Sequence, residues 1–134
     1  MLRLLPIFAG AVMMLAMTAT ARATEWMYCS DPTDEVQVGF LLGGLDFTQV
    51  SGTTLRIGEQ WWSDSPEVEK GQPLALGDYF FDWKVLNATV VDENHETVLA
   101  QLRLVVMETE DDIVKGGVMS VPGKGLYVIG CEGP

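Results

Sequence analysis

Apolar and polar residues alternate along several short stretches of this chain. In residues 36–42 every second residue is apolar, from Val36 to Leu42. Residues 97–107 repeat the pattern, with one apolar face and with Gln101 and Arg103 on the other. A period of two is typical of a β-strand that has one buried face and one solvated face.

A helix is the competing interpretation for residues 97–107, because their Leu-Ala-Gln-Leu-Arg-Leu core also has helical propensity. We favour a strand there, since valine is frequent and no helix start or stop signal flanks the segment.

Turn signals recur every 8–12 residues between these apolar stretches. The predicted turns lie at residues 43–44, 51–52, 58–59, 92–95, 108–112 and 122–125. The remaining predicted strands are residues 45–50, 53–57, 60–63, 80–91, 113–121 and 126–131, and residues 64–76 are predicted as a loop. Short strands at this spacing predict an all-β fold, either a small antiparallel β-barrel or a sandwich, of about eight short strands.

The N-terminal 23 residues differ from the rest of the chain. Arg3 precedes an apolar stretch, which ends in small residues and an Ala21-Arg22-Ala23 site. This order of charged, apolar and small residues is typical of a cleavable secretory signal peptide. We therefore expect Sec-dependent export to the periplasm or the extracellular space, no membrane span after cleavage, and one domain over residues 24–134.

Removal of the signal makes the domain more acidic. The whole chain has 8 basic and 19 acidic residues, and two of the basic residues but no acid lie in residues 1–23. Residues 24–134 therefore have a net charge of −13. Such a surface disfavours nucleic acid and favours a cationic partner. We therefore expect the partner to be a cationic protein or a cell-wall glycan. The sequence predicts no particular oligomeric state.

Two cysteines, Cys29 and Cys131, lie near the two ends of the predicted domain. An even number of cysteines in an exported protein predicts a disulfide. This bridge would bring the first and last strands together, either side by side or stacked across the core. A redox-active pair would instead favour a Cys-x-x-Cys spacing.

Catalytic motifs are missing from the sequence. The only histidine, His95, lies in a predicted polar turn, and no serine elbow, phosphate-binding glycine loop or metal-ligand spacing is present. We therefore expect no enzyme activity, no metal and no cofactor; a small hydrolase that uses two carboxylates is an alternative. Trp61 and Trp62 are candidate partner contacts, because adjacent residues on a strand face opposite sides and one indole would face outward.

Four short segments resemble the periplasmic inhibitors of C-type lysozyme. They are Tyr-Cys-Ser-Asp at 28–31, Ser-Gly-Thr-Thr-Leu at 51–55, Trp-Trp at 61–62 and Lys-Gly-Gln-Pro-Leu at 70–74. The order is similar to that family within residues 28–76, although Leu55 stands where the family has tyrosine. The resemblance implies a β-barrel that inhibits a cationic lysozyme, with Ser51 and Lys70 at the inhibitory contacts.

Overall fold

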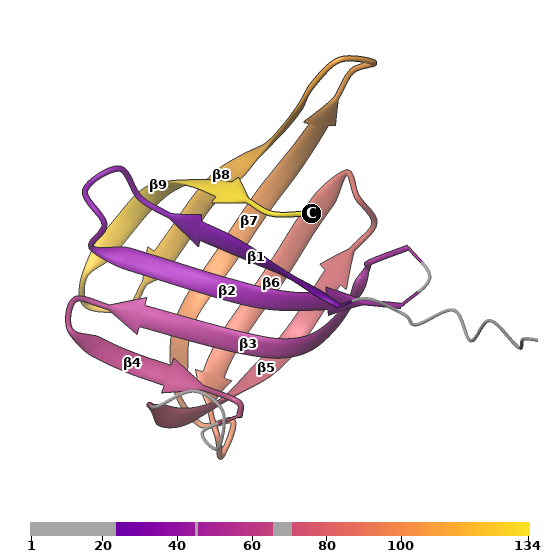
Figure 1. Ribbon diagram of the computed structural model, residues 1–134. Coiled ribbons are helices and arrows are strands. Elements are labelled where there is room, and N and C mark those ends of the chain that lie inside the picture. Colours follow the sequence, from indigo (N-terminus) through magenta and orange to yellow (C-terminus); the bar gives the residue numbers. More distant parts are fainter. Residues whose placement is uncertain (1–23, 45, 66–70) are drawn as a thin grey trace, which may run out of the picture.

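The computed structural model describes residues 24–44, 46–65 and 71–134, so the predicted signal peptide and Lys70 lie outside the described residues. The described part is all-β and has nine strands that close into a barrel (Figure 1). The strands are β1 (Glu25–Ser30), β2 (Val36–Gly43), β3 (Gln49–Ile57), β4 (Gln60–Ser63), β5 (Gln72–Phe81), β6 (Val85–Asp92), β7 (Val98–Glu108), β8 (Ile113–Val121) and β9 (Gly125–Glu132). The predicted fold class is confirmed, and the barrel replaces the sandwich alternative. Residues 97–107 are strand rather than helix.

Strand order follows chain order all the way around the barrel. Neighbouring strands are antiparallel except β4 and β5, which pair in parallel. A closed ring with an odd number of strands cannot alternate direction everywhere, so one parallel pair is a geometric necessity. That pair is short, with only Trp62 opposite Gln72 and Ser63 opposite Pro73.

The predicted disulfide closes the barrel between its first and last strands. Cys29 on β1 lies directly opposite Cys131 on β9, with the two Cα atoms 4.0 Å apart, and the two sulfur atoms are bonded. The two strands share three residue pairs. Of the two arrangements that the sequence left open, the strands lie side by side.

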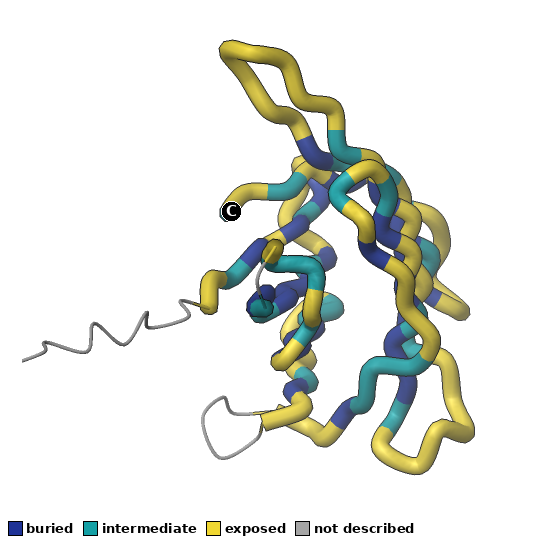
Figure 2. Tube along the Cα trace, turned by 90° about the vertical axis from the view of Figure 1, so that its right-hand side faces the viewer, coloured by how far each residue is buried: buried dark blue, intermediate teal, exposed yellow. Residues whose placement is uncertain are grey.

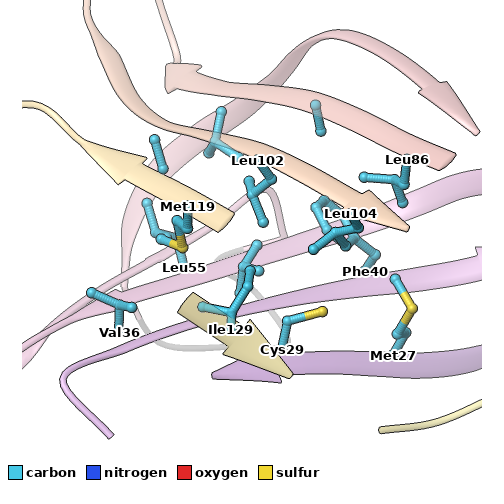
Figure 3. Packing of buried hydrophobic residues seen from close by; sticks show 14 of the residues in the cluster. Met27, Cys29, Val36, Phe40, Leu55, Leu86, Leu102, Leu104, Met119 and Ile129 are labelled. Carbon is cyan, nitrogen blue, oxygen red and sulfur yellow. The ribbon is translucent and has the colours of Figure 1, made fainter. Parts of the chain in front are cut away.

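Side chains that point inward fill the barrel (Figure 3). Phe40, Leu55, Leu102 and Met119 are fully buried and come from β2, β3, β7 and β8. The alternation predicted for β7 holds, since Ala100, Leu102 and Leu104 are buried while the residues between them are exposed. The interior is therefore a packed hydrophobic core.

Three predicted boundaries differ from the structure. In the region predicted as a strand at residues 45–50 and a turn at 51–52, residues 46–48 are not strand, and β3 begins at Gln49 and continues through Ser51 and Gly52. Gly52 lies against the side chains of Leu41 and Trp26. The strand β5 begins at Gln72, within the predicted loop, where Pro73 is tolerated because its pairing to β4 ends there.

The third difference lies in the predicted strand at residues 80–91, which is broken between Phe81 and Val85 by a turn. Trp83 has a φ of 65° there, and its indole N–H donates to the main-chain oxygen of Asp46. The main-chain N–H groups of Lys84 and Val85 donate to the Asp82 carboxylate. A long-range contact and a local acid thus stabilise a turn that no glycine signals.

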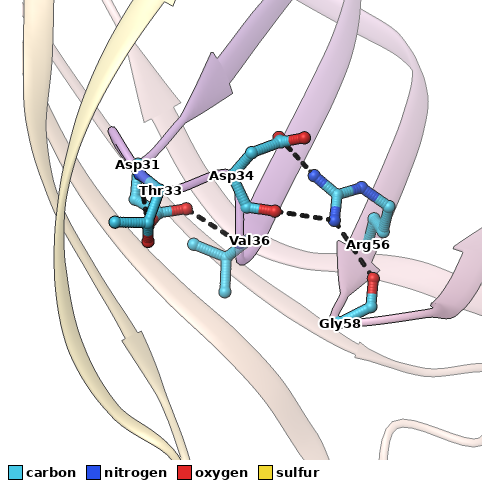
Figure 4. Close-up of polar contacts among 6 residues, drawn as sticks. All are labelled: Asp31, Thr33, Asp34, Val36, Arg56 and Gly58. Atoms are coloured by element: carbon cyan, nitrogen blue, oxygen red, sulfur yellow. Dashed lines mark hydrogen bonds and ion pairs between the residues drawn. The ribbon is translucent and has the colours of Figure 1, made fainter.

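Aspartate carboxylates organise several other turns. At the β1–β2 turn, Asp31 accepts hydrogen bonds from the Thr33 hydroxyl at 2.5 Å and the Val36 main-chain N–H at 2.9 Å (Figure 4). Burial disfavours the charged form of Asp31, but these hydrogen bonds outweigh it, and the pKa of Asp31 lies below its ordinary value. Asp46, Asp82 and Asp92 likewise accept hydrogen bonds from residues of their own turns.

The β7–β8 hairpin projects beyond the rest of the barrel, as two views at right angles show (Figures 1 and 2). Its tip is almost entirely exposed (Figure 2). No helix capable of crossing a membrane occurs within the described ranges.

Candidate functional site

The outer surface of β7, β8 and β9 has a group of exposed aliphatic side chains, which we call the apolar face. Its members are Val105, Met107, Val114, Val118, Leu126 and Val128, with exposed fractions from 47 to 80%. Val118 lies directly opposite Val128, and Met107 directly opposite Val114. Scattered exposed aliphatic residues are normal in soluble proteins, whereas a contiguous group on one face is typical of an interaction surface.

Acidic residues border this face at the tip of the projecting hairpin. Glu108 ends β7, and the turn that follows contains Glu110, Asp111 and Asp112; all four acids are exposed. Met107 and Val114 precede and follow this turn, so aliphatic and acidic groups lie side by side on the hairpin. The arrangement suits a partner surface that is apolar with cationic edges.

A hollow of about 510 Å³ adjoins the apolar face, where β8 and β9 meet β1 and β2. Gly130, Tyr28, Val114 and Glu132 are among its lining residues. A Cβ atom added to Gly130 would meet nothing within 4 Å. The missing side chain therefore leaves open space on the outside of the barrel.

The two candidate tryptophans occupy different environments. Trp61 is 41% exposed, and the Arg56 guanidinium lies over its ring, 5.7 Å from the centroid. Trp62 is half-buried, packs against the core and lies opposite the buried Leu55. The expected split into one outward and one inward indole is confirmed.

Ser51, the candidate contact taken from the resemblance, is exposed on β3, and its hydroxyl donates to the Leu41 main-chain oxygen at 3.3 Å. On β3, Ser51 lies five residues from Arg56, and Arg56 is directly opposite Trp61 on β4. That spacing amounts to about 17 Å along a strand. The structure therefore does not bring Ser51 and Trp61 together.

Sequence reasoning missed Lys115, which points into the barrel and is only 7% exposed. Its ammonium group lies 5.6 Å from the centroid of the Trp83 ring and donates to the main-chain oxygens of Gly133 and Pro134. Burial lowers the pKa of Lys115. The available signal was its register, since Lys115 shares the inward face with Met119 and Val121.

Sequence reasoning also missed the apolar face. The signal was that residues 126–129 are apolar at outward as well as inward positions, and that Val114 and Val118 are apolar at outward positions, which a half-solvated sheet does not require.

The positions of His95 and of the acids in two hollows bear on metal binding and on catalysis by two acids. His95 lies exposed in the β6–β7 turn with a φ of 58°. In the described part of the chain, no group of three His, Cys, Asp or Glu side chains is placed to hold a metal ion. A second hollow, of about 440 Å³ over β5, β6 and β7, has one carboxylate, Asp78, and the hollow at Gly130 also has one, Glu132.

Comparison of the chain with protein-family models, with curated proteins and with solved structures finds no match. The functional argument therefore depends on the geometry of the barrel surface, with the apolar face, the acidic turn and the hollow at Gly130 as its main features.

Proposed function

We propose that this protein is an exported, non-enzymatic binding domain that docks a cationic protein on its apolar face. The observation that carries the proposal is the contiguous exposure of aliphatic side chains on β7–β9 beside the acidic hairpin turn. Burial of such a face on a partner would gain roughly 25 cal/mol for each Å² of apolar surface removed from water.

Charge favours a cationic partner over a second copy of the chain. Residues 24–134 have a net charge of −13. Two copies joined through the apolar face would bring two acidic turns close to the same interface, which like-charge repulsion opposes. A basic protein surface would instead be steered toward the face, and the effect would weaken with salt.

A lysozyme inhibitor is the sharper version of this proposal. It is supported by the acidic charge and by the short segments that resemble the periplasmic inhibitors of C-type lysozyme. In this version Ser51 and Lys70 would contribute inhibitory contacts, and Ser51 is exposed, as such a contact requires. A hydrolase with paired carboxylates is the alternative from a different class; among the described residues, the hollows at Asp78 and at Glu132 each have one acid in their lining.

Binding to three cationic proteins of different shape, hen lysozyme, cytochrome c and ribonuclease A, tests the proposal. Calorimetric titrations are run at low ionic strength, about 10 mM, where charges interact over about 30 Å, and at about 150 mM, where that range is about 8 Å. We expect micromolar binding to at least one protein at low salt and weaker binding at high salt. No binding to any of the three at low salt would overturn the proposal.

Substitutions in the apolar face localise the interaction. The double variant Val118→Thr/Val128→Thr keeps the side-chain shape and the β-branching but makes the face polar. We expect its affinity to fall at least tenfold, while the matched control Val98→Thr, at an exposed valine of β7 outside the face, binds as the unmodified protein does. Equal binding by the double variant would show that the apolar face is not the docking surface.

Lysozyme activity separates the two versions of the function. An inhibitor would slow cell-wall hydrolysis by hen lysozyme in proportion to the complex formed, and Ser51→Ala or Lys70→Ala would relieve that inhibition. Binding without any loss of lysozyme activity would leave the docking function and remove the inhibitor version.

A further inference from the structure

The hollow beside the apolar face is lined by Gly130, which has a second glycine, Gly116, as its cross-strand neighbour. Gly116 on β8 lies directly opposite Gly130 on β9, and Gly130 lies opposite Ser30 on β1. Alternation along the strands puts both glycines on the outer surface, level with Val105 of the apolar face. The hollow is therefore continuous with the proposed docking surface.

The walls of this hollow combine apolar and aromatic groups. Ile113 and Val114 line it on the side of β8, and both are exposed. Tyr28 lines it on the side of β1, with its ring stacked against Trp26 at a centroid distance of 5.5 Å and an angle of 12° between the planes. Aliphatic side chains of β8 and the Tyr28 ring thus border a space that no side chain of Gly130 fills.

The polar groups of the hollow include one carboxylate and two neutral side chains that can accept hydrogen bonds. The Glu132 carboxylate is exposed and has no hydrogen-bond or ion-pair partner within the described ranges. The Gln37 amide oxygen and the Ser30 hydroxyl add two neutral acceptors. Lys115 lines the hollow, but its ammonium group donates to the Gly133 and Pro134 oxygens beneath the barrel wall.

We propose that this hollow binds an arginine side chain that projects from the cationic partner. The aliphatic stem of the arginine would lie along Val114, and its planar guanidinium would pack beside Tyr28 and donate to Glu132 and Gln37. Arginine suits the hollow better than lysine, because its planar guanidinium has five donors and stacks on aromatic rings. The inference rests on the proposed function, since it names the anchor residue of that partner.

The acidic surroundings strengthen this choice. The hollow lies between the tip of the β7–β8 hairpin, where Glu108 and the three acids of the turn lie, and the β1–β2 turn, which contains Asp31, Asp34 and Glu35. A cation in the hollow would therefore experience attraction from both ends. Buried arginine and tyrosine side chains are also the usual energetic centres of protein interfaces.

A small probe tests the hollow without the partner. N-acetyl-arginine amide is titrated into the ¹⁵N-labelled protein, and the amide resonances are followed by NMR. We expect saturable shifts centred on Gly130, Cys131 and Glu132 with a millimolar dissociation constant. The uncharged N-acetyl-norleucine amide should cause no such shifts, and N-acetyl-lysine amide should bind more weakly than the arginine probe.

Two variants connect the shifts to the hollow. Gly130→Val fills the open space, and its Cβ would have no other atom within 4 Å, so no clash is expected. Glu132→Gln removes the carboxylate charge. Both should weaken binding of the arginine probe at least fivefold, and their thermal unfolding confirms that they fold. Unchanged binding by both variants, or shifts with N-acetylglucosamine but not with the arginine probe, would overturn the inference.

The apolar-face variant keeps this test separate from the proposed function. Val118→Thr/Val128→Thr should lose affinity for the cationic protein but bind the arginine probe unchanged. A protein that docks its partner while failing to bind the probe would refute the arginine site alone. A protein that binds the probe but none of the three cationic proteins would refute the proposed function alone.

Discussion

Cys29 and Cys131 lie directly opposite each other on β1 and β9 and are joined by a disulfide across 102 residues of sequence. Only three residue pairs form this seam of the barrel, whereas β7 and β8 share eight. The bond thus covalently fastens a short seam between the two ends of the described chain.

Removal of the bond should destabilise the barrel strongly. In the chain-entropy model, a disulfide that closes a loop of about 100 residues stabilises the fold by about 4–5 kcal/mol. We expect Cys29→Ala/Cys131→Ala to lower the free energy of unfolding by up to that amount, with a larger denaturant dependence because its unfolded chain is more expanded. Urea unfolding with and without reductant measures this. A reductant effect on the double variant would point to a cause other than the disulfide.

Arg56 should stabilise the fold mainly through its hydrogen bonds to main-chain oxygens and less through its ion pair with Asp34. Its guanidinium donates to the main-chain oxygens of Asp34 and Gly58, at 3.0 and 3.1 Å, as well as to the Asp34 carboxylate (Figure 4). The Arg56 side chain is 13% exposed, while that of Asp34 is 74% exposed. Loss of the arginine leaves two main-chain oxygens without their donor, whereas an exposed ion pair contributes little.

We therefore expect Arg56→Met to cost about 2 kcal/mol of unfolding free energy and Asp34→Asn about 0.5 kcal/mol or less. Asparagine is a suitable replacement because it tolerates the φ of 56° at position 34. Chemical denaturation of both variants measures the difference. Equal losses would mean that the ion pair accounts for the role of Arg56.

Thr53 is a buried polar side chain whose removal should stabilise the protein. It is fully buried on β3, and its hydroxyl has no hydrogen-bond partner within the described ranges. An unsatisfied buried hydroxyl costs about 1–3 kcal/mol. We expect Thr53→Val to raise the unfolding free energy by about 1 kcal/mol, and Thr53→Ser, which keeps the hydroxyl and loses the methyl group, to lower it by a similar amount. A valine variant less stable than the unmodified protein would contradict this.

A fall in pH should destabilise the turns that aspartate carboxylates hold together. Hydrogen bonds hold the pKa of Asp31, Asp46, Asp82 and Asp92 below the ordinary value, although burial acts the other way and is the largest single effect at Asp31. A carboxyl whose folded-state pKa is lowered contributes stability above its unfolded-state pKa and loses it as pH falls through the folded-state value. We expect the unfolding free energy to decline below about pH 4.

Asp92→Asn tests this pH dependence at one turn. The Asp92 carboxylate accepts hydrogen bonds from the main-chain N–H groups of Glu96 and Thr97, at 2.8 and 3.0 Å. Asparagine keeps an oxygen acceptor but has no titrating charge. Urea unfolding between pH 2 and pH 6 should show a shallower decline for the variant. Coincident curves would mean that Asp92 does not contribute to the acid sensitivity.

The β7–β8 and β8–β9 hairpins were predictable from sequence because their signals are local. Inward Leu102 and Met119 alternate with outward residues, and an acidic turn or a Pro-Gly-Lys-Gly turn joins the strands. The Cys29–Cys131 bond was also predictable, since only two cysteines are available to pair.

The turn at Trp83 was not predictable, because it depends on an indole hydrogen bond to Asp46, 37 residues away in sequence. The first half of β5 could not be predicted from the sequence for a similar reason. Pro73 reads as a loop signal, and only its place at the end of a two-residue parallel pairing makes it compatible with a strand.

The candidate site shows the same division. Trp61 and Trp62 were expected on opposite faces from their adjacency, and this holds because alternation is a local property of strands. The hollow at Gly130 was beyond sequence reasoning, since it needs the register that places Gly116, Gly130 and Ser30 in one row.

The pattern of the chain is therefore sufficient for the β class, most of the strands and the disulfide, because alternation, turn residues and cysteine count act locally or by simple pairing. Tertiary structure alone decided that the sheet closes into a barrel, that the Lys115 ammonium group meets the Gly133 and Pro134 oxygens, and that aliphatic residues of β7–β9 meet on one outer face. These features depend on strand register and ring closure, which are set by contacts between residues far apart in sequence.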